Sequence, residues 1–315
     1  MENNDNPTRR NEAAEELTIP EILESFRIYD GAYKRDEINA AIKLKDEIIP
    51  RLIEILENVL AEPGKYVEDE NLYDHIYAVM LLGHLKASKA HKTIVDMFSR
   101  PDDWPGEIFG DVATSDLPVI LLNTCGGSVE RIKSMILNKE ADDYCRASAC
   151  QALAYAAIEG YEPRESVIDF FGTLFSGEEA DEISDFWGLL ANIVCDLYPE
   201  EVMDVIERAY ADGLIMPGLI PYSAFEKALK LGKEKCLERL KNDLERHGMD
   251  DIHASMSWWA CFNEDSREFP SLADADYDYF PGYSGQSSSQ SLKKKKKAKK
   301  KKQKQAKASK KKNRR

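Results

Sequence analysis

The sequence predicts an all-α fold, a HEAT- or armadillo-like α-solenoid of about six helical pairs with disordered termini. Apolar residues recur three and four positions apart from Thr18 to Phe262, which is the spacing of a helix with one buried face, and no stretch alternates as a strand does. A helical pattern also returns every 34 to 42 residues. A repeat of that length fits two helices and two turns, so we expect stacked helical pairs that form a right-handed superhelix.

Composition changes along the chain divide it into four segments. The first residues are polar and offer little to bury, whereas the middle of the chain carries the helical periodicity. Aspartate, serine and glutamine then replace the apolar residues, and the last stretch is dominated by lysine. We predict a disordered leader (1–16), an α-solenoid domain (17–262), an acidic and serine-rich linker (263–292) and a disordered polybasic tail (293–315).

The first helix is expected to begin near Thr18, because Pro20 and Glu21 then fall in its first turn. A repeated helix follows, in which two apolar residues stand on either side of a polar one. The polar centres of its six copies, the first, third and sixth of which are looser, are Glu54, Asp96, Ser134, Asp169, Asp204 and Glu238. At 100° per residue the centre points away from its apolar neighbours. Asp96, Asp169 and Asp204 are therefore predicted to face solvent and not to be catalytic.

A second helix of the repeat carries small apolar residues. Ala149, Ala152, Leu153 and Ala156 form a stripe at positions i, i+3, i+4 and i+7. The helical region ends in Trp258-Trp259-Ala260-Cys261-Phe262. We expect this block to close the last repeat against solvent, although an exposed aromatic platform is the alternative.

The charge of the chain is unevenly distributed. The 315 residues contain 43 Lys and Arg and 57 Asp and Glu, for a formal net charge of −14. Residues 293–315 hold 16 of the basic residues and no acid, so 27 basic residues face 57 acidic ones in the rest of the chain. The protein is therefore predicted to have an acidic body and a basic tail, and the partners of the two parts are considered separately because their charges differ in sign.

Cysteines and apolar runs exclude several classes of protein. The six cysteines occur singly, without a CxxC spacing or a close histidine partner, so we expect reduced buried thiols and neither a metal nor another cofactor. The longest apolar run, Leu189 to Cys195, is interrupted by Asn192 and is too short to span a membrane. With no apolar targeting segment at the N-terminus, the expected location is cytoplasmic, without membrane attachment.

Several stretches resemble a bacterial family of HEAT-like proteins of unknown function, over roughly residues 19–262. The resemblance is carried by residues 75–83, 109–112 with 116–117, 144–149, 197–202, 209–214 and 258–262. It implies an α-solenoid and no assigned reaction. Relatives often end in a SEC-C motif, a short cysteine-rich zinc module. No cysteine follows Cys261 here, so that zinc site is not available to this chain.

His75, Tyr77 and Asp111 are the best candidates for a catalytic cluster, because all three lie in the stretches that match the family and Asp111 follows a glycine. They define the alternative function, an enzyme of unknown reaction with a site in the groove of the solenoid. A hydrogen-bonded core histidine and a helix-capping aspartate are the favoured roles for His75 and Asp111.

The tail carries the clearest functional signal. It has no aromatic residue for base stacking, so it is expected to bind phosphates without reading sequence. We predict a noncatalytic adaptor whose solenoid binds a protein partner and whose tail binds RNA or the ribosome; folding back onto the acidic body, or a role in solubility, is the alternative. The predicted nucleic-acid-binding residues are Lys293, Lys294, Lys295, Lys296, Lys297, Lys299, Lys300, Lys301, Lys302, Lys304, Lys307, Lys310, Lys311, Lys312, Arg314 and Arg315.

Overall fold

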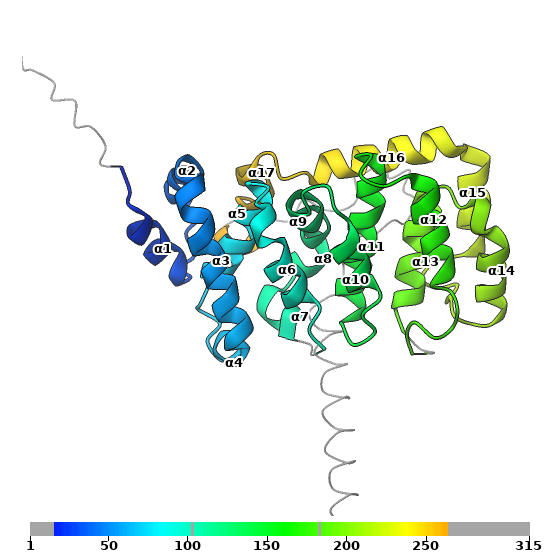
Figure 1. The fold of residues 1–315 in the computed structure, drawn as a ribbon, viewed down its shortest axis with the longest axis horizontal. Coiled ribbons are helices and arrows are strands. Elements are labelled where there is room, and N and C mark those ends of the chain that lie inside the picture. The colour runs from blue at the N-terminus through cyan, green and yellow to red at the C-terminus, as the bar shows by residue number, and fades with distance from the viewer. Residues whose placement is uncertain (1–15, 102–103, 182–183, 264–315) are drawn as a thin grey trace, which may run out of the picture. The chain divides into compact units, whose positions relative to one another are not determined.

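The computed structural model describes residues 16–101, 104–181 and 184–263, and over these ranges it is all-α, as predicted. No strand forms within them; Ile28 and Leu72 share a single antiparallel bridge. None of the helices described is long and apolar enough to cross a membrane. The α-helices, shown in Figure 1, are α1 (Ile19–Arg27), α2 (Arg35–Lys43), α3 (Lys45–Ala61), α4 (Pro63–Glu68), α5 (Asp74–His84), α6 (His91–Phe98), α7 (Trp104–Phe109), α8 (Val112–Ser115), α9 (Leu117–Thr124), α10 (Glu130–Ile136), α11 (Asp143–Ile158), α12 (Arg164–Thr173), α13 (Phe186–Asp196), α14 (Met203–Ala211), α15 (Tyr222–Leu231), α16 (Lys233–His247) and α17 (Ile252–Met256).

Helices that follow one another along the chain lie side by side (Figure 1). Helix α3 packs against α5, α6 against α9, α10 against α11, and α12 against α13. Five of the predicted polar centres fall on α3, α6, α10, α12 and α14. Asp169 and Asp204 are exposed and Asp96 is partly exposed, which confirms that these aspartates point away from the packed face.

Helix α11 lies at the centre of the core. Its N-cap Asp142 accepts hydrogen bonds from the backbone nitrogens of Tyr144 (2.9 Å) and Cys145 (3.2 Å), which fixes where the helix begins. The predicted stripe is fully buried, with Ala152 and Leu153 at 0% exposure. Because alanine lacks a bulky side chain, α9, α10 and α13 can all pack closely against this one helix.

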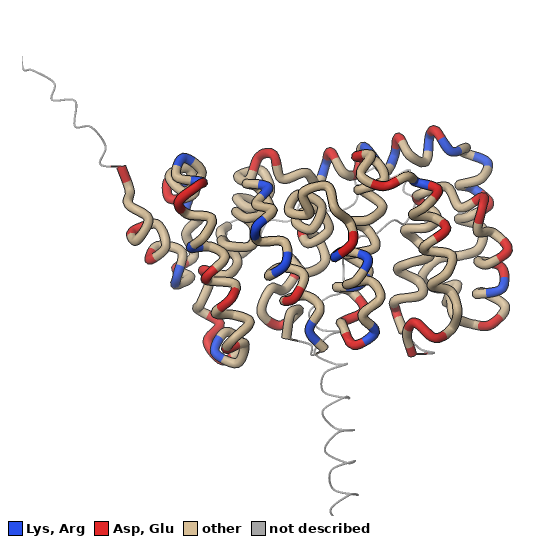
Figure 2. Tube along the Cα trace, viewed as in Figure 1, with Lys and Arg blue, Asp and Glu red and all other residues tan. Residues whose placement is uncertain are grey.

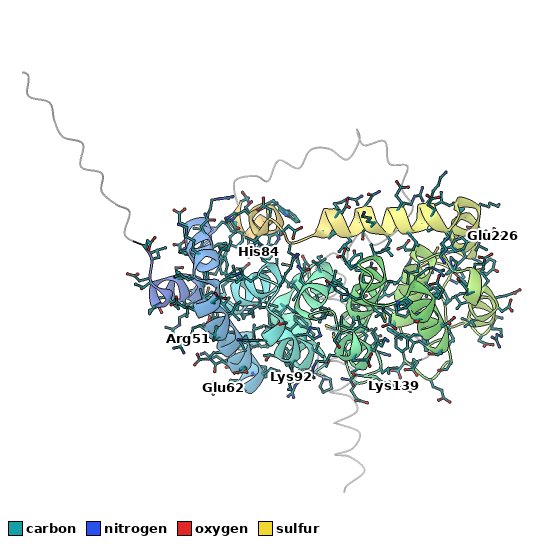
Figure 3. All side chains as sticks on the ribbon, turned by 45° about the horizontal axis from the view of Figure 1, so that its top comes forward. Arg51, Glu62, His84, Lys92, Lys139 and Glu226 are labelled. Carbon is teal, nitrogen blue, oxygen red and sulfur yellow. The ribbon has the colours of Figure 1, made fainter. Side chains whose placement is uncertain are left out.

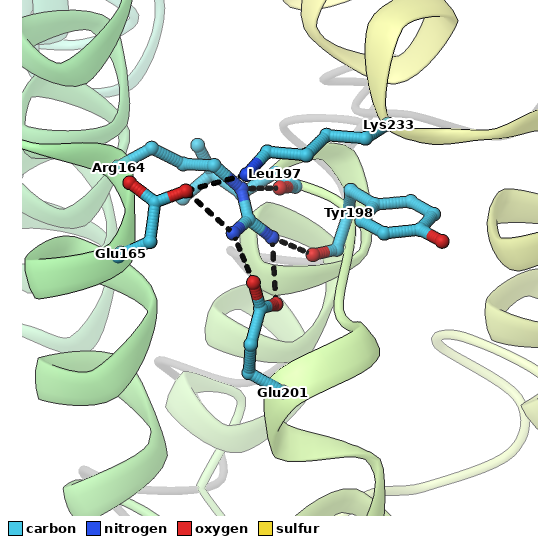
Figure 4. Close-up of polar contacts among 6 residues, drawn as sticks. All are labelled: Arg164, Glu165, Leu197, Tyr198, Glu201 and Lys233. Carbon is cyan, nitrogen blue, oxygen red and sulfur yellow. Dashed lines mark hydrogen bonds and ion pairs between the residues drawn. The ribbon is translucent and has the colours of Figure 1, made fainter.

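Buried arginines connect neighbouring helices. At the start of α12, Arg164 donates from Nε to the carbonyl oxygen of Leu197 (2.7 Å) and from Nη2 to that of Tyr198 (Figure 4). Its guanidinium also forms an ion pair with Glu201, at 2.5 and 2.9 Å. These partners satisfy a charge that is only 7% exposed and hold the end of α13 against α12.

A second arginine makes an equivalent connection one pair earlier. Arg146 is fully buried, and it donates from Nε to the carbonyl oxygen of Ile136 (2.9 Å) and from Nη1 to that of Glu179 (2.7 Å). Its guanidinium lies 3.9 Å from the ring centre of Phe186. The bonds from Arg146 to Glu179 and from Arg164 to Leu197 each span 33 residues.

The sixth predicted copy, centred on Glu238, does not begin another helical pair. It lies on α16, which has 15 residues and runs back across α15, α13 and α11 (Figure 1). Only Cys236, Leu240 and Leu244 are buried, so the helix has a single narrow apolar stripe and lies on the surface of the others.

The predicted role of Trp258–Phe262 is also wrong. This block does not close the last pair, because α16 carries the chain back to the first helices, where the hydroxyl of Tyr29 donates to the carbonyl oxygen of Cys261. Trp259 stacks on Phe262 with ring centres 6.0 Å apart, whereas Trp258 is 70% exposed. The predicted leader up to residue 15, the linker from residue 264 and the tail lie outside the described residues.

We expect Ala152→Leu to lower the free energy of unfolding by about 1–3 kcal/mol, because the fully buried Ala152 leaves no room for a larger side chain. Chemical denaturation followed by circular dichroism measures the change. Asp169→Asn is the control, and it should change stability by less than about 0.5 kcal/mol because Asp169 is exposed. Equal stability of Ala152→Leu and the native protein would contradict this account of α11.

Candidate functional site

The structure does not bring His75, Tyr77 and Asp111 together. His75 Nε2 donates to the carbonyl oxygen of Ile108 (3.0 Å), and the side chain is buried. Tyr77, two residues further along α5, stacks on Phe26 with ring centres 4.4 Å apart. Asp111 is exposed at the N-cap position of α8, and its side chain makes no capping hydrogen bond. The favoured role of His75, a hydrogen-bonded core histidine, is confirmed.

A different group of titratable side chains gathers where α16 crosses α11 and α13 and includes the N-cap residue of α9. We call it the α16 cluster, and define it as Asp116, Tyr155, Asp196, Asp243 and His247. At its centre, the hydroxyl of Tyr155 on α11 donates to Asp243 Oδ2 on α16 (2.6 Å). His247 Nδ1 lies 3.3 Å from Asp243 Oδ1, one helical turn away. The cluster therefore links α16 to the core helix beneath it.

Asp243 and His247 form an ion pair. Burial opposes ionisation of Asp243, but hydrogen bonds from His247 and Tyr155 outweigh it and lower the pKa of this carboxyl. The hydrogen bond to Asp243 in turn raises the pKa of His247 above its ordinary value of 6.5, against the effect of burial. Each partner thus favours the charged form of the other.

Asp116 and Asp196 lack hydrogen bonds of this kind that would favour their charged forms. Neither side chain makes a hydrogen bond or ion pair with another residue that the structure describes. Desolvation raises the pKa of Asp116 to about 7; the nearby His247 opposes this rise and Asp111 adds to it. Desolvation and the charge of Asp243 also raise the pKa of Asp196, and Arg239 opposes them, but Asp196 is exposed, so solvent screens these effects. Asp116, which is only partly exposed, is therefore the carboxyl that exchanges its proton near neutral pH.

The arrangement can hold or release protons and attract a cationic group. Within the described ranges, no three His, Cys, Asp or Glu side chains are placed to bind one metal ion. Sequence reasoning missed this cluster because its members come from four separate helical segments. The only local signal was the spacing of Asp243 and His247, four residues apart on one helix.

The comparison with known families identifies the chain. Residues 17–263 match a family described as "Protein of unknown function (DUF1186)". The protein belongs to the DUF1186 family. This confirms the predicted membership of a family of unknown function, and the DUF1186 match contains the whole α16 cluster together with the returning segment after α16.

Two relatives that match this chain over almost their whole length come from bacteria of the genus Chlamydia. One, from Chlamydia muridarum (strain MoPn / Nigg), is 29% identical over 244 residues, which cover 77% of this chain and 97% of the relative. The other, from Chlamydia trachomatis serovar D, is also 29% identical over 244 residues and is covered to 96%. Both are named "Uncharacterized protein". No solved structure matches this chain.

The α16 cluster predicts how stability depends on pH. Because the folded state raises the pKa of Asp116 to about 7, folding retains its proton, and the stability this contributes is lost as pH rises from about 4 through 7. The raised pKa of His247 acts in the same direction. We expect Asp116→Asn to flatten the fall in unfolding free energy between about pH 5 and 8.

Urea denaturation at a series of pH values measures this slope. One fully displaced proton corresponds to about 1.4 kcal/mol per pH unit, and the partial exposure of Asp116 reduces the effect below that limit. Asp204→Asn on α14 is the matched control, since Asp204 is exposed and should leave the slope unchanged. An Asp116→Asn protein with the native slope would show that Asp116 ionises as it does in water.

Proposed function

We propose that this DUF1186 protein is a noncatalytic adaptor in which an α-solenoid of HEAT or armadillo type binds a protein partner and the lysine-rich tail binds RNA, chiefly that of the ribosome. The observation that carries the proposal is the separation of charge, with 16 basic residues and no acid in residues 293–315. A segment of that composition interacts strongly only with polyanions. A cytoplasmic location belongs to the same proposal.

The solenoid assignment is supported by contacts that recur between successive helical pairs. Besides the two arginine bonds, His75 to Ile108 and His91 to Thr124 are hydrogen bonds that also span 33 residues. A common spacing is expected when each pair stacks on the next in the same way. Each pair then contacts mainly its neighbours, and the array offers a partner one long surface.

The edge of the array opposite α16 is rich in charged side chains. Figure 3 shows Arg51, Glu62, Lys92 and Lys139 along this edge, on or next to α3, α6 and α10. All four are exposed. Acidic residues are spread over all parts of the described chain (Figure 2). These groups suit a polar partner that contacts several pairs at once.

The acidic body repels phosphate, so attraction to RNA must come from the tail. If six lysines neutralise phosphates, the logarithm of the binding constant should fall with the logarithm of salt concentration at a slope of roughly −4 on single strands. Binding without base stacking or base-edge contacts is insensitive to RNA sequence. The enzyme alternative has no comparable support, because His75 bonds to the backbone of Ile108, Tyr77 stacks on Phe26 and Asp111 is exposed.

Deletion of residues 293–315 should abolish association with ribosomes and with single-stranded RNA and leave the melting temperature unchanged. Fluorescence anisotropy between about 50 and 200 mM salt measures binding and its slope. A scrambled tail of the same composition should bind as the native tail does, whereas replacement of its lysines by glutamine should remove binding.

Two outcomes would contradict the proposal. Ribosome binding by the truncated chain equal to that of the full chain would place the interaction on the helical body. Weak RNA binding by the full chain, together with a tail that protects the acidic body from chemical modification, would support the alternative in which the tail folds back.

A further inference from the structure

The segment that follows α17 forms a short turn with its own internal hydrogen bonds. Phe262 donates from its backbone nitrogen to the carbonyl oxygen of Trp259 (3.0 Å). The side-chain amide of Asn263 donates to the carbonyl oxygens of Ser257 (2.7 Å) and Trp259 (3.0 Å). The rings of Trp259 and Phe262 stack on each other, with an angle of 8° between their planes. We call residues 257–263 the aromatic turn.

Four tyrosines of the first helices surround the ring of Phe262. Two lie on the connection between α1 and α2, and two lie at the start of α5 and within it. The distances from their ring centres to that of Phe262 are 5.3 to 6.5 Å. The four residues, which we call the tyrosine pocket, are Tyr29, Tyr33, Tyr73 and Tyr77. Figure 1 shows α17, which leads into the aromatic turn, beside α5.

Three of the four tyrosine hydroxyls bond to the returning segment. The hydroxyl of Tyr29 donates to the carbonyl oxygen of Cys261, and that of Tyr73 lies 3.5 Å from Cys261 Sγ. The hydroxyl of Tyr33 lies 2.8 Å from Nδ1 of His253 on α17. Because every residue has a carbonyl group, the bond from Tyr29 recognises a backbone, whereas the ring contacts select an aromatic side chain. The pocket therefore recognises a carbonyl group that directly precedes an aromatic residue.

The composition of the tyrosine pocket is that of a binding surface. Tyr29, Tyr33 and Tyr73 are only partly buried, so the pocket opens at the surface of the body. A tyrosine ring supplies apolar contact area, and its hydroxyl can bond to water when the pocket is uncovered. Tyrosine is for this reason enriched where proteins bind other proteins. Helix α11, in the permanent core, buries mainly small side chains instead.

The aromatic turn can leave the pocket without breaking backbone pairing. Among the described residues, every backbone–backbone hydrogen bond of residues 251–263 joins two members of this same segment. Its attachment to the first helices therefore consists of side-chain contacts, which open more readily than a shared backbone ladder. Ile252 and Met256 are buried, so α17 stays anchored while the turn moves.

We propose that the tyrosine pocket is a docking site for a protein partner that presents two aromatic side chains three residues apart in a turn, and that the aromatic turn covers this site in the free protein. The partner displaces residues 257–263 because it offers the same rings to the pocket and the same carbonyl group to Tyr29. The chain's own turn is tethered beside the pocket and competes at a high effective concentration. Only a closely matching partner then binds. This inference rests on the protein-binding half of the proposed function, and it names the partner's chemistry.

Peptide binding to the full-length protein tests the docking site. The probe is a fluorescent peptide with the sequence of residues 251–263, and fluorescence anisotropy measures its binding. Phe262→Ala removes the chain's own ring from the pocket, and this protein should bind the peptide about tenfold more tightly than the native protein does. Trp258→Ala is the matched control, because Trp258 belongs to the same turn but is 70% exposed, and it should bind as weakly as the native protein.

Two further changes, each made in the Phe262→Ala protein, locate the bound peptide. Tyr33→Ala should weaken peptide binding about tenfold, because Tyr33 has the ring nearest to that of Phe262. Tyr29→Phe should weaken it about fivefold, because it removes only the hydroxyl that bonds to the carbonyl group of Cys261. A peptide in which alanine replaces the phenylalanine should not bind.

Phe262→Leu guards against a Phe262→Ala protein that fails to fold, because it keeps an apolar side chain and removes the ring; circular dichroism verifies the fold of each variant. The proposal is wrong if the folded variants bind the peptide no better than the native protein, or if Tyr33→Ala leaves binding unchanged. A native dimer in size-exclusion chromatography that Phe262→Ala abolishes would also overturn it, because a second copy would then supply the occupant. None of these results affects RNA binding by the tail, so failure of the docking site and failure of the RNA tether are distinguishable.

Discussion

Leu240 and Leu244 can be buried only if α16 lies across the helices beneath it, and this requirement determines the course of the rest of the chain. Once α16 has run back over α15, α13 and α11, the following residues reach the first helices and bond to His84, Tyr33 and Asn39. The described end of the chain is therefore held near its beginning. In a repeat array without such a return, each pair would contact its neighbours alone. Here the first helices also depend on residues 249–262.

Burial also determines the polar contacts between neighbouring helices. A buried guanidinium is costly unless all its donors find acceptors, and the carbonyl groups at the end of a helix lack partners within that helix. Arg164 meets both needs, because it bonds the carbonyl groups of Leu197 and Tyr198 where α13 ends. Arg146 meets the second need at Ile136, the last residue of α10, although its Nη2 has no hydrogen-bond partner and lies 3.8 Å from Glu179 Oε2. These side chains position neighbouring pairs in a way that apolar packing, which has no direction, does not.

Much of the fold could be predicted from local periodicity. The apolar spacing predicts helices and the alanine stripe of α11 correctly, because both depend on which face of one helix is buried. The path of α16 could not be predicted in this way. It depends on which other helices accept Cys236, Leu240 and Leu244, and nothing near these residues in the sequence records that. The predicted role of Trp258–Phe262 is wrong for the same reason, because the path of α16 carries this block to Tyr29.

The candidate site could not be predicted from local sequence patterns either, because its members lie far apart in the sequence. The pKa of Asp116 depends on His247, 131 positions away, and the pKa of Asp196 depends on Asp243. Only the folded chain brings these charges together. His75, Tyr77 and Asp111 drew attention because they are polar residues in family-like stretches, yet burial and aromatic packing explain His75 and Tyr77 without a reaction.

Ionisation within the α16 cluster affects how firmly α16 is held. Burial raises the pKa of Asp116, and the hydrogen bond to Asp243 raises the pKa of His247, so the folded state favours a protonated Asp116 and a charged His247. Both contributions to stability are lost as pH rises, that of Asp116 as pH passes through about 7. Because α16 brings the chain back to the first helices, a weaker attachment of α16 also acts on the contacts of Met249 with His84 and of Cys261 with Tyr29. The polar cluster on α11 and the contacts around α5 are therefore coupled through a single helix.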